Sequence, residues 1–217
     1  MQRRTFVAGV AGATAALSGC ISTLNDFRTA SRSGSRTYDV DAGTSLHVLN
    51  RTGSVTAERH DGETVTLDFE IEGPSSDAVE AVSVTDSHED GELQLEVEPG
   101  DSSADRDTSV SMTVQYPDSV FVSRLRTRSG SIDADVSGIE DGAEIESTNG
   151  SVDAALASGL DAAVTATTTN GSVTVHDLEL DSSSTSATEV SGTLGDGSKS
   201  LTLRTENGSI DLRALSD

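Results

Sequence analysis

A glycine recurs through the C-terminal half of this chain, each time after a Ser/Thr-rich approach and shortly before an apolar residue. The repeated glycines are Gly130, Gly150, Gly171, Gly192 and Gly208, and the steps between the first four are 20, 21 and 21 residues. Gly53, followed by Ser54 and Val55, opens a similar turn earlier in the chain. A regular period of this length is typical of stacked repeats, in which each unit buries its apolar edge against its neighbours. We therefore expect all six glycines to form structural turns.

Positions counted from each glycine hold side chains of the same kind. Position +2 is apolar, with Ile132, Val152, Val173, Leu194 and Ile210, and position −5 holds Leu125, Ile145, Ala166, Ala187 and Leu203. Position −3 is a small hydroxyl residue in Thr127, Ser147, Thr168 and Thr205. Stacked parallel strands require such columns, because successive side chains alternate between the two faces. The columns predict a β-solenoid or β-roll with rungs of roughly 20 residues.

The outward columns place opposite charges in phase. Arg124 and Arg126 stand one repeat before Glu144 and Glu146. Stacking would bring each pair to about 4.8 Å across neighbouring strands. A chance repeat would have no reason to pair charges in this way, so the charges support the same register.

The chain before the repeat is also typical of β-structure. Apolar residues alternate strictly in Val65–Ile71, Leu93–Val97 and Val110–Tyr116, which predicts strands with one buried face and one solvated face. The segment Ser75–Ser83 is ambiguous and is compatible with a short helix. We expect an all-β fold in one domain over residues 44–217, with an N-terminal antiparallel layer or cap (44–122) and repeat rungs (123–213).

The N-terminus has the features of an export signal. Arg3 and Arg4 form a twin-arginine start, followed by a short apolar run that ends in Leu17-Ser18-Gly19-Cys20. Cys20 is the only cysteine, which excludes a disulfide within the chain, and it stands where a lipoprotein peptidase would cut. We expect residues 1–19 to be a signal peptide and residues 20–43 a lipidated cysteine and flexible tether. The protein would then lie outside the cytoplasm, anchored to the membrane by lipid.

The composition restricts the classes of partner. Without Arg3 and Arg4 the chain has 12 basic residues against 37 acidic ones, a net charge of −25. Lys199 is the only lysine, and the chain has no tryptophan. This composition resembles that of haloarchaeal proteins, whose carboxylates keep them soluble in concentrated salt. It argues against nucleic-acid binding, and the regular alternation argues against the disorder that low hydrophobicity would otherwise suggest.

No motif for catalysis or for a cofactor is present. The four histidines, His47, His60, His88 and His176, lack the spacing of metal ligands, and no nucleophile motif accompanies the many serines. Asp133 and Asp153 share the +3 column and are weak candidates for a cation site, although a solvated acidic face explains them better. Four Asn-x-Ser/Thr sequons, at Asn50, Asn149, Asn170 and Asn207, are possible glycan acceptors in an exported chain.

The run from Leu46 to Leu212 resembles the putative-adhesin domain of unknown function found in envelope proteins of bacteria and archaea. The resemblance depends on the opening turn Gly53–Val55, on Val114–Pro117 at the end of a strand, and on serial Gly-Ser-β-branched turns at Gly130, Gly150, Gly171 and Gly208. Gly192, followed by Thr193-Leu194, departs from that pattern. The resemblance implies a β-solenoid-like surface domain with no established catalytic residues.

These observations favour a non-catalytic, lipid-anchored cell-surface module with a structural or adhesive role, binding a surface protein or glycan. One alternative is a regulatory or sensory envelope lipoprotein that binds a protein partner by strand addition at an exposed sheet edge. The other, less favoured, is an enzyme acting on polysaccharide. The sequence predicts neither the ligand nor the oligomeric state.

Overall fold

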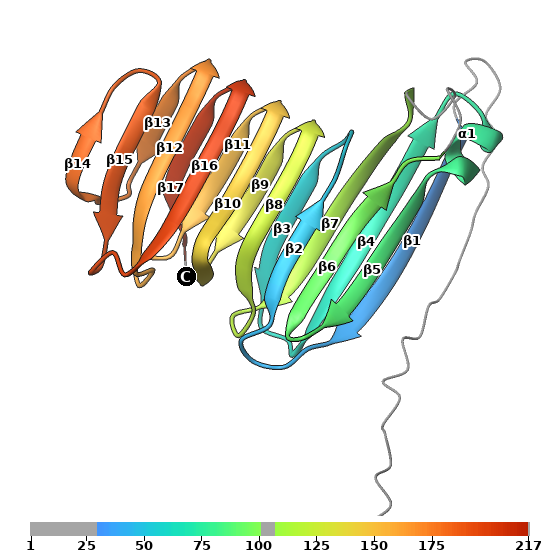
Figure 1. The fold of residues 1–217 in the computed structure, drawn as a ribbon, viewed down its shortest axis with the longest axis horizontal. Helices are drawn as coiled ribbons and strands as arrows, with labels where there is room; N and C mark the ends of the chain where they lie inside the picture. Colours follow the sequence, from blue (N-terminus) through green and yellow to red (C-terminus); the bar gives the residue numbers. More distant parts are fainter. Residues whose placement is uncertain (1–29, 101–106, 217) are drawn as a thin grey trace, which may run out of the picture.

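The computed structural model describes residues 30–100 and 107–216 (Figure 1). One short helix, α1 (Ser76–Ala81), lies among the strands, with the Ser75 side chain as its N-cap. The strands in the described residues are β1 (Ala30–Asp39), β2 (Ser45–Leu49), β3 (Val55–His60), β4 (Thr64–Gly73), β5 (Ser83–Glu89), β6 (Glu92–Glu98), β7 (Ser109–Pro117), β8 (Phe121–Ser129), β9 (Ile132–Val136), β10 (Ile139–Asn149), β11 (Val152–Leu156), β12 (Ala162–Asn170), β13 (Val173–His176), β14 (Asp181–Thr185), β15 (Glu189–Leu194), β16 (Lys199–Asn207) and β17 (Ile210–Ala214). The all-β prediction is therefore confirmed. No helix in this part of the chain is of a length and hydrophobicity that would let it cross a membrane.

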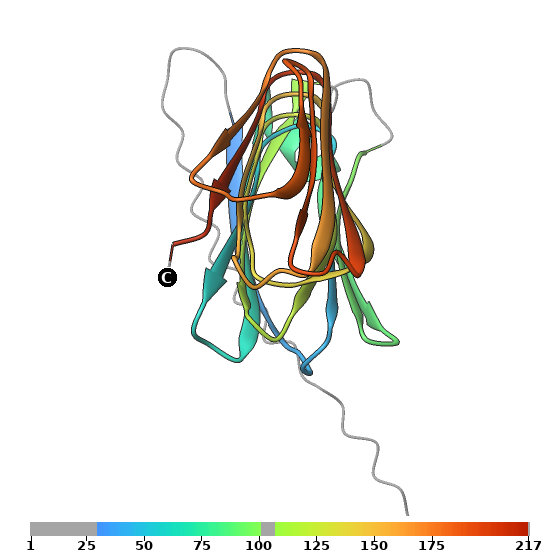
Figure 2. The same cartoon turned by 90° about the vertical axis from the view of Figure 1, so that its left-hand side faces the viewer.

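The strands form two sheets that face each other along the long axis of the molecule (Figures 1 and 2). We call them sheet A, with the order β1-β4-β7-β3-β9-β11-β17-β13, and sheet B, with the order β14-β15-β12-β16-β10-β8-β2-β6-β5. Their inner faces enclose one continuous apolar core. The ends of the molecule are consequently formed by β1 and β5 on one side and by β13 and β14 on the other.

Pairs of strands joined at a glycine build the middle of the molecule. In each pair, which we call a rung, the first strand lies in sheet B and the second in sheet A: β2–β3, β8–β9, β10–β11, β12–β13 and β16–β17. Neighbouring rungs pair in parallel, with Leu125 beside Ile145 and Ile145 beside Leu203. All three side chains are completely buried. Apart from Ala187, the inward columns of the sequence form the core, as a β-solenoid-like arrangement requires.

The rungs are not stacked in chain order. The last rung, β16–β17, lies between β10–β11 and β12–β13, and pairs in parallel with both. The chain reaches this slot through the turn 195–198, which passes the beginning of β12. There the Asp161 carboxylate accepts hydrogen bonds from the backbone nitrogen and hydroxyl of Ser198, at 3.0 and 2.6 Å. The C-terminal rung is consequently an interior layer of the stack.

Gly192 lies in a different setting from the other repeated glycines. It is inside β15, which runs antiparallel to both β12 and β14, so its segment adds no further rung. Ala187, expected to face inward, is exposed. The prediction of a structural turn at Gly192 is therefore wrong. The glycine instead allows β14 to come close, because a Cβ there would lie 2.7 Å from the Leu180 Cβ.

Residues 30–39 belong to the folded domain and not to a tether. They form β1, which pairs antiparallel with β4 along its whole length. Of the side chains in β1 only Tyr38 is buried, so the strand lacks the apolar alternation that predicts strands. The boundary expected at residue 44 is therefore wrong for this segment, and pairing with a strongly alternating neighbour explains why a polar segment is a strand.

The two tyrosines of the chain predict how the fold responds to alkali. Tyr116 is fully buried and donates its hydroxyl hydrogen to the Asp135 carbonyl. Burial raises the pKa of Tyr38 to about 12 and also raises that of Tyr116, chiefly because the phenolate would lose its hydration. Both phenols are therefore stabilising below their unfolded pKa of 10.0. The contribution of Tyr38 is lost as the pH rises through about 12, and that of Tyr116 as the pH rises through its own raised pKa.

We expect tyrosinate absorbance to appear in one cooperative step together with the loss of β-sheet circular dichroism, above the pH at which a denatured sample titrates. The comparison with denaturant-unfolded protein is the control, because it reports the same two phenols without burial. Ordinary titration of both tyrosines while the circular dichroism stays native would contradict the burial described above.

Candidate binding surfaces

Gly53 and the repeated glycines other than Gly192 form a continuous column along one edge of the stack, where the chain turns from sheet B into sheet A. A Cβ on Gly130 would collide with the Gly53 carbonyl, one on Gly150 with the Gly130 carbonyl, and one on Gly208 with the Gly150 carbonyl. Gly171 has the same relation to Gly208, in the stacking order of the rungs. These corners need glycine because neighbouring backbones touch there.

Buried hydroxyl groups hold the corners to one another. Each −3 side chain donates to the glycine carbonyl of the preceding layer: Thr127 to Gly53 (3.0 Å), Ser147 to Gly130 (2.8 Å), Thr205 to Gly150 (2.8 Å) and Thr168 to Gly208 (2.7 Å). All four donors are buried. Asn50 occupies the equivalent place in the first rung and donates to the Val110 carbonyl at 2.7 Å. The column predicted as small hydroxyls thus gives each of these glycine carbonyls a hydrogen bond from a buried donor in the neighbouring layer.

The four sequons differ in access. Asn50 is only 6% exposed and its amide is committed to Val110, so a glycan cannot be attached to it in the folded domain. Asn149, Asn207 and Asn170 are exposed at the corners. Their amides form a ladder in which Asn170 donates to Asn207 and Asn207 donates to Asn149, both at 3.0 Å. Glycan attachment at these three positions stays a prediction.

The outer face of sheet B carries the predicted charge pairs. Arg124 lies 2.9 Å from Glu144, and Arg126 lies 3.4 Å from Glu146. The stacking register deduced from the charges is therefore confirmed. Because these side chains are partly exposed, each pair contributes little to stability, about 0–1 kcal/mol. The face is flat and polar, with alternating charges.

The outer face of sheet A carries a column of three carboxylates. The interior position of the last rung places Asp211 beside Asp153, which is itself beside Asp133. The pKa of Asp153 is raised, first by burial and then by Asp211 and Asp133, while Arg213 opposes the shift. The Arg213 guanidinium lies 3.5 Å from the Asp133 carboxylate. This arginine partly offsets the repulsion along the column.

The candidate cation ligands do not form a metal centre in the part of the chain that the structure describes. No group of three or more His, Cys, Asp or Glu side chains there is arranged to hold a metal ion. The histidines are dispersed: His47 lies 3.4 Å from Glu92, His176 lies 3.8 Å from Asp211, and His60 contacts the Thr64 carbonyl. Burial is the main cause of the lowered pKa of His47. Asp133 and Asp153 are thus neighbours on an acidic face.

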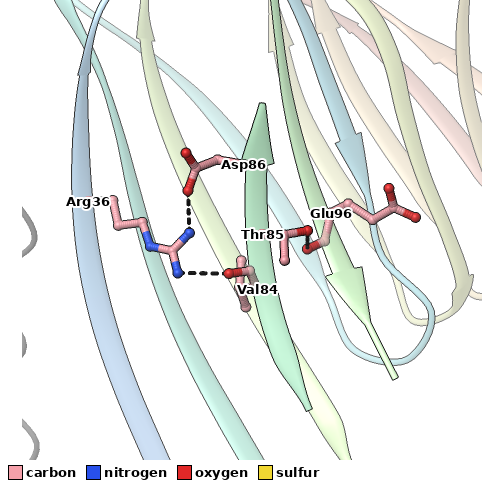
Figure 3. A network of polar contacts seen from close by, with 5 residues as sticks. All are labelled: Arg36, Val84, Thr85, Asp86 and Glu96. Carbon is pink, nitrogen blue, oxygen red and sulfur yellow. Dashed lines mark hydrogen bonds and ion pairs between the residues drawn. The ribbon is translucent and has the colours of Figure 1, made fainter. Parts of the chain in front are cut away.

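Arginine side chains close the edge of sheet B at one end of the molecule. Arg32 donates to the Val82 carbonyl at 2.7 Å. Arg36 donates to the Val84 carbonyl at 2.7 Å and also pairs with Asp86 (Figure 3). Both carbonyls lie at or beside the free edge of β5, at the end of sheet B. An incoming strand would have to displace these two side chains. The two arginines therefore hinder strand addition at the beginning of this edge.

The edge of sheet A at the opposite end is more open. β13 pairs only with β17, and on its outer side the Val173 nitrogen donates to the Ala187 carbonyl at 3.0 Å. Val175 is half-buried, and its backbone groups on that side have no hydrogen-bond partner within the described residues. A surface hollow of about 550 Å³ lies beyond the end of this strand, lined by Asp177, Glu179 and Asp181 among other residues. Sequence reasoning did not identify this edge, because it depends on the stacking order.

These features define an all-β module of stacked strands, with flat polar faces and one edge where the glycine corners of neighbouring rungs are in close backbone contact. The chain belongs to the Toastrack DUF4097 family, whose model matches residues 22–213. No curated protein matches the chain. The residues of the predicted export signal and anchor, Arg3, Arg4 and Cys20, lie outside the described residues.

Two solved structures resemble this protein at low sequence identity. One, named "putative cell adhesion protein", is from Clostridium sporogenes and has a TM-score of 0.46 and 11% identity; the match covers 85% of this protein and 100% of that one. The other, named "putative adhesin", is from Bacteroides fragilis and has a TM-score of 0.29 and 13% identity; the match covers 85% of this protein and 97% of that one.

Proposed function

We propose that this protein is a non-catalytic binding module of the cell envelope, anchored outside the cytoplasm by lipid on Cys20. The observation that carries the proposal is the stack itself, in which hydrogen-bonded rungs form outer faces that are flat, polar and charged. Flat faces of this kind suit contact with another surface better than they suit enclosure of a small substrate. The sequence Leu17-Ser18-Gly19-Cys20, where a lipoprotein peptidase would cut, supports the anchored location.

The two ends of the stack support an orientation on the membrane. Cys20 precedes β1 by ten residues, which span at most about 35 Å when extended. β1 forms one end of the long axis, and β13 to β15 form the other (Figure 1). An anchor at Cys20 would hold the β1 end near the lipid and present the β13 end outward. The exposed end would then be available to a surface protein or glycan.

Strand addition at β13 is the second candidate, for a regulatory or sensory lipoprotein that binds a protein partner. It is favoured by the contrast between the beginning of the β5 edge, where Arg32 and Arg36 hold two carbonyls, and β13, whose Val175 backbone groups lie free on the outer side. Pairing at an exposed edge gives affinity through main-chain hydrogen bonds. A proline in place of Val175 removes the outward N–H and leaves the alternate residue Thr174 to pair with β17.

The full-length protein with its own signal should be expressed beside the Cys20→Ser variant and a Val175→Pro variant. We expect membrane fractions to contain wild-type protein that begins at lipidated Cys20, and the Cys20→Ser protein to be released. Intact cells with the anchored protein should bind protein-coated or glycan-coated surfaces more strongly than cells expressing Cys20→Ser.

Three outcomes separate the alternatives. An unprocessed wild-type protein in the cytoplasm would refute the envelope location. Anchored protein that confers no binding beyond the Cys20→Ser control would refute the adhesive role. Binding that survives Val175→Pro, with the variant folded and anchored, would refute strand addition and leave the flat faces as the contact surface.

A further inference from the structure

Three corners of the stack contain the same reactive dipeptide, Asn-Gly, at Asn149, Asn207 and Asn170. In this dipeptide the glycine nitrogen can attack the Cγ carbonyl of the asparagine, since no side chain on the glycine hinders the approach. The attack needs a glycine nitrogen that is free of hydrogen bonds and an asparagine amide group that is free to rotate. The structure distinguishes the three sites on both counts.

The glycine nitrogens differ because the rungs have an order. Gly150 donates to the Asn207 carbonyl at 2.9 Å, and Gly208 donates to the Asn170 carbonyl at 3.0 Å. Gly171 belongs to the last layer, and its nitrogen has no acceptor within the described residues. The neighbouring turn uses the carbonyls of Ala187 and Thr188 to accept hydrogen bonds from the backbone nitrogens of Val173 and Thr168, which lie on either side of Gly171. The attacking glycine nitrogen is therefore hydrogen-bonded at Gly150 and Gly208 and free at Gly171.

The side-chain ladder distinguishes the same corner independently. The Asn207 amide accepts from Asn170 and donates to Asn149, and the Asn149 amide accepts from Asn207 and donates to the Arg128 carbonyl at 3.3 Å. Asn170 is at the end of this ladder and makes only one of these bonds, as a donor. Asn170 and Gly171 are both exposed, so water reaches them.

We propose that Asn170 is the site at which this domain is modified by spontaneous deamidation. The Gly171 nitrogen attacks the Asn170 Cγ and forms a new C–N bond, while the bond between Cγ and Nδ2 breaks with release of ammonia. Water then opens the resulting five-membered ring. Breaking the new C–N bond gives aspartate, and breaking the original main-chain bond gives isoaspartate. Both products add one negative charge and remove the donor to Asn207.

The expected preference for deamidation at Asn170 follows from the number of hydrogen bonds that must break before cyclisation. Cyclisation at Asn149 has to break one backbone and one side-chain hydrogen bond more than cyclisation at Asn170. Two hydrogen bonds of ordinary strength slow the reaction about 10- to 30-fold. Asn149 is a closely matched control, because both sites lie in the pentapeptide Thr-Asn-Gly-Ser-Val.

The experiment uses the full-length protein, made in a host without N-glycosylation and incubated folded in concentrated salt at mildly alkaline pH. A protease that cleaves on the amino side of aspartate separates the sites into the peptides 141–152, 161–176 and 196–210. Mass spectrometry then follows conversion of each asparagine with time. The aspartate product creates a new cleavage site, and the isoaspartate product does not.

We expect Asn170 to convert about 10- to 30-fold faster than Asn149 and Asn207 in the folded protein. In denaturant the preference over Asn149 should disappear, because only the fold distinguishes these two sites. Equal rates at the three sites in folded protein, or fastest conversion at Asn149 or Asn207, would overturn the proposal. A preference for Asn170 over Asn149 that persists in denaturant would overturn its structural cause. The result is independent of anchoring and binding.

Discussion

Replacing Gly150 by alanine is expected to destabilise the domain by about 3–5 kcal/mol, a large share of the 5–15 kcal/mol typical of a folded domain. The added Cβ would collide with the Gly130 carbonyl of the neighbouring rung. The Gly150 φ of +156° lies outside the range that alanine adopts readily. Relief by backbone movement is costly, because Ser147 and Thr205 bond the carbonyls on either side of this corner.

Equilibrium unfolding in urea at constant high salt measures this loss as a lower midpoint at an unchanged slope. Gly159→Ala is the matched control, since a Cβ at Gly159 has open space around it and its φ is not in the left-handed region. We expect that control to stay within about 0.5 kcal/mol of the wild type. Equal midpoints for Gly150→Ala and the wild type would mean that the rungs do not approach as closely as described.

The columns within each repeat could be predicted from the sequence because they depend on local periodicity. Leu125, Ile145 and Leu203 share a column by counting alone, and all three are buried side by side. The charge pair of Arg126 and Glu146 follows from the same counting. Alternation within a strand fixes which face a side chain occupies, whatever the rest of the protein does.

The stacking order could not be predicted in this way. It depends on which strand edges pair, and β16 fits equally well in register beside β10 and beside β12. Gly192 has an apolar residue two positions later, as a corner does, yet its strand runs in the opposite direction. Local spacing carries no information on strand direction, so the false corner could not be distinguished by counting.

The surfaces of functional interest could not be predicted either, because they depend on the stacking order. The acidic column of Asp133, Asp153 and Asp211 and the open edge at β13 exist only because the last rung lies inside the stack. The buried role of Asn50 was also hidden, since its sequon is typical of an exposed turn. Its position three residues before Gly53, in the column of buried hydroxyls, was the available signal.

A protein truncated after Gly197 is expected to lose its cooperative fold, although it lacks only the last rung and the C-terminal residues after it. In a stack that follows chain order, such a truncation would remove one terminal layer and leave the rest paired. Here it removes the layer between β10–β11 and β12–β13, so both lose a neighbour. Four completely buried apolar side chains go with it: Leu201, Leu203, Ile210 and Leu212.

The magnitude follows from burial. Deleting one such leucine or isoleucine side chain typically costs about 2–5 kcal/mol, so loss of all four, about 8–20 kcal/mol, is as large as the whole stability of an ordinary domain, about 5–15 kcal/mol. Lys199 is lost as well; its ammonium group donates to the Ile139 carbonyl at 2.6 Å and lies 4.8 Å from the centre of the Phe121 ring. Closure of the gap by direct pairing of β10 with β12 would require the 157–161 connection and the glycine corners to shift together.

Circular dichroism and urea unfolding of the truncated protein test this expectation, with a variant that lacks only Ser216 and Asp217 as the control for C-terminal shortening. We expect the control to unfold like the wild type and the truncated protein to show no cooperative transition. A cooperative transition near the wild-type midpoint would place the last rung at the end of the stack and contradict its interior position. Restoration of the transition by an added peptide of residues 199–214 would instead show that the slot between β10 and β12 accepts its rung from a separate molecule.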